Sequence, residues 1–105
     1  MIREHFEFRE TIATILADSR ESIEDAKEGM LSARQEVERC IAGDPFFAAT
    51  LEPYTPRSRT RTVLRMVEAG FRAGVGPMAA VAGAIAWAGV ERMQEKGASF
   101  GVIDN

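Results

Sequence analysis

Hydrophobic and polar residues alternate along the start of the chain, from residue 2 to residue 9. A period of two that includes aromatic residues is typical of a strand with one solvated face. The segment 11–17 is rich in β-branched residues and predicts a second strand. A turn near Glu10 would make an antiparallel hairpin, and one long bent strand is the alternative. The side of the first strand expected to be covered carries Ile2, Glu4, Phe6 and Phe8.

The apolar spacing then changes to steps of three and four residues, which predict a long helix. Asp18 is the expected N-cap, and Glu21 three residues later completes a capping-box pattern. Charged residues occupy the other faces, and Gly43 is expected to end the helix. The apolar stripe consists of Ile23, Ala26, Met30, Ala33, Val37 and Ile41.

Two further helices are predicted before residue 75. Asp44 is the expected N-cap of a short helix with Pro45 at its first position. Ser58 or Thr60 is expected to cap the next helix, which ends at Gly74. The residues expected to attach the short helix to the core are Phe46, Phe47 and Leu51. Those expected to face inward from the next helix are Val63, Met66, Val67 and Phe71.

An uncharged stretch begins at Gly76-Pro77 and predicts a fourth helix that runs to about Lys96. Because no charge appears from Met78 to Val90, we expect this part to be buried nearly all round. This helix contains Gly83 and Gly89, and each glycine costs about 1 kcal/mol of helix propensity relative to alanine. We therefore expect that close packing, rather than helix propensity, explains why glycine occupies these positions. The small residues that would allow close backbone approach are Ala79, Gly83, Ala86 and Gly89.

The segment 98–103 predicts a third strand, so helices lie between strands in the sequence. This order predicts an α+β fold in a single domain of 105 residues. We expect a small antiparallel or mixed sheet, formed by the N-terminal hairpin and the C-terminal strand. About three to four helices would pack with this sheet.

Charge and composition narrow the classes of partner. With 13 basic and 16 acidic residues the net charge is −3, which gives no long-range attraction to nucleic acid or to an anionic membrane. The single cysteine, Cys40, excludes a disulfide within the chain and favours the cytoplasm. The N-terminus has no apolar targeting segment, and we interpret the long uncharged run as a buried helix.

The turn Gly74–Gly76 before the fourth helix is one candidate site. Free backbone N–H groups at a helix start can bind an anion. The turn lacks both the Walker A lysine and the complete dinucleotide-binding glycine pattern. From the residues alone, a tight helix–helix turn is the favoured interpretation.

The remaining candidates are isolated. The pair Asp104-Asn105 follows a strand, where polar side chains can face a ligand, and fraying of a chain end is the alternative. His5 is expected on the solvated face, Cys40 is expected to pack as a small apolar residue, and no metal-ligand set is predicted. A solvated face is favoured over phosphate binding for the one basic cluster, which contains Arg57, Arg59, Arg61 and Arg65.

The string Gly74-Val-Gly-Pro-Met-Ala-Ala-Val-Ala-Gly-Ala-Ile-Ala86, followed by Phe100-Gly-Val-Ile-Asp-Asn105, resembles an uncharacterised bacterial and archaeal family related to ApbE. ApbE proteins are FAD:protein FMN transferases. The predicted hairpin, the long helix and Asp44-Pro45 also resemble the N-terminal half of that family, so the resemblance covers essentially the whole chain.

The resemblance implies an ApbE-like fold and a site for FAD or FMN. The residues expected to contribute to it are Gly74, Gly76, Pro77, Met78, Ala79, Asp104 and Asn105. Relatives continue with Gly-Gly-Asp and a second half that supplies further site residues, so the domain is expected to be incomplete at its C-terminus. Ala79 and Ala80 stand in the region where ApbE transferases often carry a lysine. Catalytic residues are not assigned, and we expect the chain alone to be inactive.

A non-catalytic assembly module is the alternative function. A small sheet with unpaired edges can pair with a second chain. A homo-oligomer is therefore expected, and it is compatible with flavin binding. A regulator that binds anions through its arginines ranks third.

Overall fold

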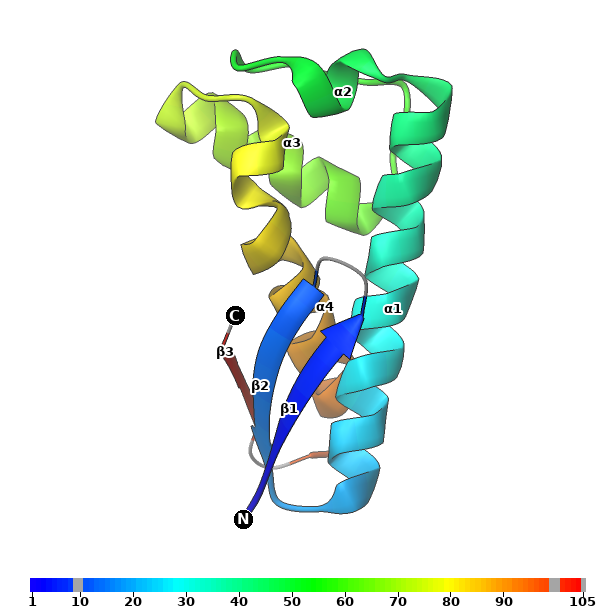
Figure 1. Ribbon diagram of the computed structural model, residues 1–105, viewed down its shortest axis with the longest axis vertical. Helices are drawn as coiled ribbons and strands as arrows, with labels where there is room; N and C mark the ends of the chain where they lie inside the picture. Colours follow the sequence, from blue (N-terminus) through cyan, green and yellow to red (C-terminus); the bar gives the residue numbers. More distant parts are fainter. Residues whose placement is uncertain (9–10, 99–100, 105) are drawn as a thin grey trace. The chain divides into compact units, whose positions relative to one another are not determined.

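The computed structural model describes residues 1–8, 11–98 and 101–104. The chain folds as two compact units, one formed by Met1–Ser32 with Ile85–Asn105 and the other by Ala33–Ala84. The elements follow one another as β1 (Ile2–Phe8), β2 (Thr11–Ala17), α1 (Arg20–Gly43), α2 (Phe46–Ala49), α3 (Arg61–Ala73), the 3₁₀ helix η1 (Pro77–Ala80), α4 (Val81–Glu95) and β3 (Gly101–Asp104) (Figure 1). The predicted α+β class and the predicted order of strands and helices are confirmed.

The first unit contains an antiparallel three-stranded sheet in the order β1-β2-β3. Ile2 pairs with Ala17 across the hairpin, so the predicted hairpin is confirmed and the single bent strand is wrong. The expected turn near Glu10 lies outside the described residues. The third strand begins at Gly101, and Ile15 pairs with Ile103.

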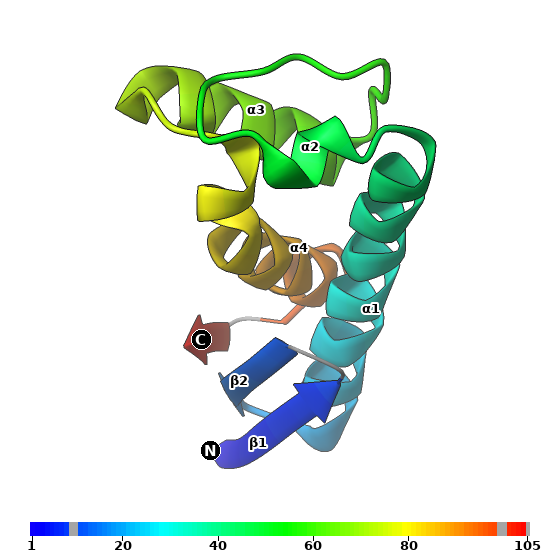
Figure 2. The same cartoon turned by 45° about the horizontal axis from the view of Figure 1, so that its top comes forward.

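One face of this sheet is covered by the parts of α1 and α4 that belong to the first unit (Figure 2). The predicted alternation in β1 is confirmed for residues 2–6. Arg3 and His5 are exposed, whereas Ile2, Glu4 and Phe6 are partly buried. The side chain of Phe8 lies outside the described residues. The buried side chains of this unit include Ile15, Ala17, Ile23, Ala26, Met30, Ile85 and Met93.

Helix α1 begins one residue later than its predicted cap implies. The Ser19 hydroxyl accepts a hydrogen bond from the Ser22 backbone N–H at 3.1 Å, so Ser19 takes the N-cap role expected of Asp18. The predicted stripe of α1 is confirmed: all its members are buried except Ile41, which is partly buried. Serine and aspartate are equally good caps, so local propensity did not distinguish between these neighbours.

The second unit packs α2 and α3 around an apolar core (Figure 2). Thr60 is the N-cap of α3 but makes no side-chain cap, and the Glu36 carboxylate of α1 instead accepts the Thr62 backbone N–H at 3.3 Å. The first helical turn of α3 is thus stabilised by a side chain remote in sequence. The buried core residues are Val37, Cys40, Phe47, Val63, Met66 and Ala84.

Several predictions for this unit are wrong. Pro45, rather than Asp44, is the N-cap of α2, and no side chain caps that helix. Phe47 is buried as expected, but exposed fractions of 56% and 86% show that Phe46 and Leu51 do not enter the core. In α3, Phe71 is likewise exposed. A helix of four residues can direct only one of its two adjacent phenylalanines inward.

The uncharged segment is less buried than predicted. Its first four residues form η1, and α4 follows from Val81. Ala84, Ile85 and Gly89 are buried, whereas Gly83 and Trp87 are exposed, so burial nearly all round is wrong. The absence of charge therefore did not indicate burial on every face, because surfaces of folded proteins also contain many apolar atoms.

Candidate functional site

The predicted glycine turn is a helix C-cap. Gly74 adopts a left-handed conformation with φ of 72°, and its backbone N–H donates to the carbonyl of Gly70. The Val75 N–H donates to the same carbonyl at 3.0 Å. These two hydrogen bonds give a carbonyl in the last turn of α3 its partners, as is typical where a glycine ends a helix. Two N–H groups that an anion would need are therefore used inside the protein.

Gly76 is required by close packing within the second unit. A Cβ atom on this residue would lie 2.1 Å from the Thr50 carbonyl oxygen, far inside contact distance. Pro77, which follows it, is buried and has no N–H, while Met78 packs partly against the core. Ala79 is exposed and its N–H donates to the Gly76 carbonyl at 3.3 Å. The exposed surface of the turn comes from Gly74, Val75 and Ala79.

The hydrogen bonds of Gly74, Val75 and Ala79 leave these N–H groups engaged, which disfavours a phosphate cradle there. Val75 is 37% exposed and gives the turn a small apolar surface. The second predicted contribution, Asp104, ends β3 in the first unit. Its side chain and Asn105 lie outside the described residues.

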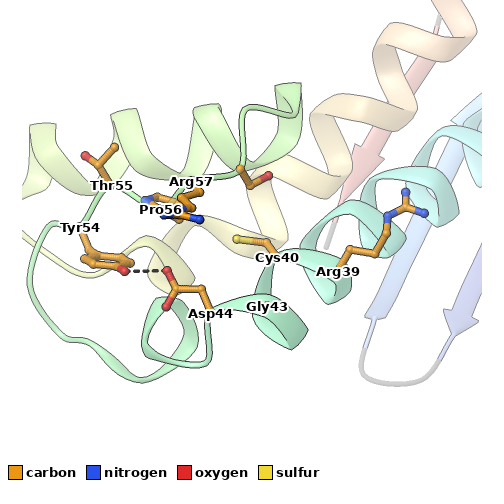
Figure 3. Close-up of a pocket in the computed structure, with 9 residues that line it drawn as sticks. Arg39, Cys40, Gly43, Asp44, Tyr54, Thr55, Pro56 and Arg57 are labelled. Atoms are coloured by element: carbon orange, nitrogen blue, oxygen red, sulfur yellow. Dashed lines mark hydrogen bonds between the residues drawn. The ribbon is translucent and has the colours of Figure 1, made fainter.

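A pocket that the sequence analysis did not predict lies wholly within the second unit. Its volume is about 600 Å³. The C-terminal end of α1 contributes one wall, and the loop between α2 and α3 contributes the other (Figure 3). The lining residues are Arg39, Cys40, Gly43, Asp44, Tyr54, Thr55, Pro56, Arg57 and Ser58.

Asp44 and Tyr54 form the clearest polar contact in this pocket. The Tyr54 hydroxyl donates a hydrogen bond of 2.6 Å to Asp44 Oδ2, and Figure 3 shows the two side chains directed at each other. This bond to the carboxylate is the largest cause that raises the pKa of Tyr54 above its ordinary value. The same hydrogen bond holds the loop to Asp44, which directly follows α1.

Cys40 is both a core residue and a pocket residue. Its exposed fraction is only 7%, and burial raises the pKa of its thiol, with the nearby Asp44 carboxylate acting in the same direction. The Ser58 hydroxyl acts in the opposite direction. The predicted packing role of Cys40 is thus confirmed. A thiol with a raised pKa is a poor nucleophile at neutral pH.

The arginines of the predicted basic cluster occupy different places. Arg57 lines the pocket, whereas Arg59 is exposed on the following loop and Arg61 begins α3. Arg39 of α1 is the second cationic pocket residue. The sequence did not predict that Arg39 and Arg57 line one pocket, because they are 18 positions apart and only the fold brings α1 and the loop together. The available signal was the connector 52–58, where Tyr54 and Thr55 stand between two prolines and are followed by Arg57 and Ser58.

The described part of the chain carries neither a metal-binding cluster nor a single membrane-spanning helix. There, no three His, Cys, Asp or Glu side chains gather in a way that could hold a metal ion. No single helix described here is long and apolar enough to cross a membrane. Only α3 taken together with Pro77–Glu95, across a sharp bend, reaches that length and composition.

Comparison with known proteins places the chain among relatives of unknown function. It is 68% identical over 105 residues to the UPF0280 protein of Methanoculleus marisnigri, covering all of this chain and 43% of that protein. The UPF0280 proteins of Methanosphaerula palustris and Methanoregula boonei are 61% and 55% identical, again over the whole chain and 44% of their length. The chain thus spans less than half the length of these relatives. The family described as "AbpE bacteria" matches residues 3–105, and the chain belongs to that family.

Proposed function

We propose that this chain is part of a flavin-binding protein of the ApbE type and contributes one face of the flavin site. The observation that carries this proposal is the family match over residues 3–105. The glycine string that suggested an ApbE relationship lies inside the matched region. The chain alone is expected to be inactive as an FMN transferase, because it covers only 43% of its relative in Methanoculleus marisnigri.

The turn that contains Gly74 and Ala79 is the proposed contact surface. Its N–H groups are largely engaged, so the proposed contact is with the isoalloxazine ring of the flavin rather than with its phosphates. Riboflavin, FMN and FAD share this ring and should therefore all bind. The contribution expected of Asp104-Asn105, which belong to the first unit, stays a separate prediction. The cytoplasm is the proposed location.

Flavin fluorescence and thermal melting test the proposal on the chain itself. Riboflavin at millimolar concentration should raise the melting temperature, because a ligand that binds only the folded state stabilises it. Ala79→Trp should weaken binding at least about fivefold by occupying the proposed surface, and Leu64→Trp, at a 41% exposed residue of α3, is the matched control. No shift with riboflavin, FMN or FAD would contradict the proposal.

We propose self-association as a second function, favoured by the sheet topology and by Trp87. In the described sheet, β1 and β3 each pair only with β2, so each has one unpaired edge. Trp87 is 55% exposed in the same unit. Such edges and aromatic surface are typical of interfaces. Multi-angle light scattering should show a dimer or larger species, and a monomer at all concentrations would contradict this proposal.

A further inference from the structure

The pocket between the end of α1 and the loop 54–58 combines cationic groups with hydroxyl groups. Arg39 and Arg57 supply the cations, and the hydroxyl residues Thr55 and Ser58 belong to the same lining. The Ser58 hydroxyl also lies 3.4 Å from that of Thr60. Arginine binds phosphate through several N–H groups at once, and hydroxyl groups donate further hydrogen bonds to phosphate oxygens. The donor set is therefore of the kind that recognises a phosphate.

The charge of the lining remains positive despite Asp44. This carboxylate accepts the Tyr54 hydroxyl at 2.6 Å, so one of its oxygens is occupied. The Cys40 thiol adds no negative charge, since burial raises its pKa. Two arginines against one aspartate leave a net charge of +1 among the charged lining residues.

The size of the pocket and its apolar surfaces indicate more than a bare phosphate. A volume of about 600 Å³ lies within the range of small-molecule sites. The Tyr54 ring is held from two sides, by Asp44 through its hydroxyl and by Phe46 through an edge-to-face contact at 5.1 Å. Pro56 is buried in the same loop. Tyr54 and Pro56 provide rigid surfaces on which a flat organic group can pack.

We propose that this pocket binds a phosphomonoester of a flat organic group. Arg57 would bind the phosphate and Arg39 would add positive charge nearby, while Tyr54 and Pro56 would contact the organic part. Figure 3 shows Arg39 turned away from the Asp44–Tyr54 pair, so Arg57 is assigned the larger part in binding. The proposal rests on the pocket alone and does not depend on flavin binding at the glycine turn.

Isothermal titration calorimetry of the whole chain tests this proposal with three probes: phenyl phosphate, phenol and inorganic phosphate. Phenyl phosphate should bind at least about tenfold more tightly than either fragment, because it alone satisfies both parts of the pocket. Arg57→Gln should weaken the binding of phenyl phosphate about tenfold, because the charged hydrogen bonds to the phosphate are lost. Arg59→Gln is the matched control, since it removes the same charge two residues away outside the lining, and it should change binding less than twofold.

Asp44→Asn provides a test in the opposite direction. The amide oxygen can still accept the Tyr54 hydroxyl, while the negative charge facing the pocket is lost. Phenyl phosphate should therefore bind several-fold more tightly to this variant, and thermal melting verifies that each variant is folded. Riboflavin binding should not respond to Arg57→Gln, which separates this result from the flavin proposal.

Three outcomes would overturn the proposal. The first is no saturable heat with phenyl phosphate at millimolar concentration in the folded wild-type protein. The second is equal weakening by Arg57→Gln and Arg59→Gln, which would show a general charge effect. The third is binding of inorganic phosphate as tightly as phenyl phosphate, which would show an anion site without an organic part.

Discussion

The Glu4 carboxylate on β1 is the clearest electrostatic feature of a single residue. It forms ion pairs with Lys27 and Arg20 of α1. The hydrogen bond from Lys27, followed by that from Arg20, holds the pKa of Glu4 below its ordinary value of 4.5. A carboxyl whose pKa is lowered by folding stabilises the protein above its unfolded pKa. This contribution is lost as the pH falls through the folded pKa.

We predict that Glu4→Gln lowers the melting temperature at pH 7 and that this difference shrinks as the pH falls from about 5 to about 3. The physical reason is that protonation of Glu4 in the wild-type protein removes the same ion pairs that the substitution removes. Melting curves followed by circular dichroism over this pH range measure the effect. Glu52→Gln, on the exposed loop, is the charge-matched control. A difference that stays constant down to pH 3 would refute the prediction.

The adjacent residues Phe46 and Phe47 offer a matched comparison of burial. Phe47 is fully buried in the core of the second unit, whereas Phe46 is 56% exposed and contacts the Tyr54 ring. We predict that Phe47→Ala lowers the free energy of unfolding by about 3–5 kcal/mol, because it leaves a cavity. Phe46→Ala should cost about 1 kcal/mol or less. Urea denaturation measures both, and similar costs would contradict the assigned packing.

At the scale of elements, glycines with different surroundings determine how α3, η1 and α4 connect. Gly74 closes α3 in the left-handed region, and Gly76 lies against the backbone at Thr50. In α4, a Cβ atom on Gly89 would meet Ile103 and Met30, while one on Gly83 would meet nothing within 4 Å. The predicted close approach is therefore confirmed at Gly89 and wrong at Gly83. Helix spacing alone does not show which glycine faces a neighbour.

These surroundings predict opposite effects for the same substitution. Gly76→Ala should lower the free energy of unfolding by about 2 kcal/mol or more, since backbone atoms cannot easily yield to the new methyl group. Gly83→Ala should raise it by about 0.5–1 kcal/mol, because alanine favours the helix and meets open space. Chemical denaturation of the two variants under identical conditions tests the sign of each effect. A destabilised Gly83→Ala would show that an unrecognised contact covers this face.

At the scale of the whole molecule, exposed apolar surface is the feature that remains to be explained. In the first unit, Trp87 and Val102 are 55% and 42% exposed. Apolar surface of this kind occurs at interfaces, where aromatic residues often supply much of the binding energy. The unpaired edges of β1 and β3 belong to the same unit. Association through the first unit is therefore the form of self-association that we propose.

We predict that Trp87→Lys shifts the protein toward the monomer, by at least about tenfold in the dissociation constant. A lysine at this position would place a charge within the proposed interface. Sedimentation equilibrium over a range of protein concentrations measures the shift. Leu51→Lys, at an exposed apolar residue of the second unit, should leave association unchanged. Equal effects of the two substitutions would exclude a specific interface at Trp87.

Predictions from local sequence patterns were correct where hydrophobic periodicity was the main signal. The alternation in β1, the stripe of α1 and the order of strands and helices follow from the periods of strands and helices. The cap at Asp44 was predicted wrongly: its carboxylate accepts the Tyr54 hydroxyl, and no side chain caps α2. The cap at Asp18 was predicted wrongly because the neighbouring Ser19 can accept the same backbone hydrogen bond. Local propensity is too similar among such neighbours to select one.

The sequence by itself determined the strands, the helices and the inward stripe of α1, since these depend on residues a few positions apart. Only the tertiary structure decided that Phe71 and Trp87 are exposed, because periodicity identifies an apolar face without showing what covers it. The pocket was likewise decided by the fold. Its arginines, Arg39 and Arg57, are separated along the chain, and only the packing of α1 with the loop gives them a common cavity.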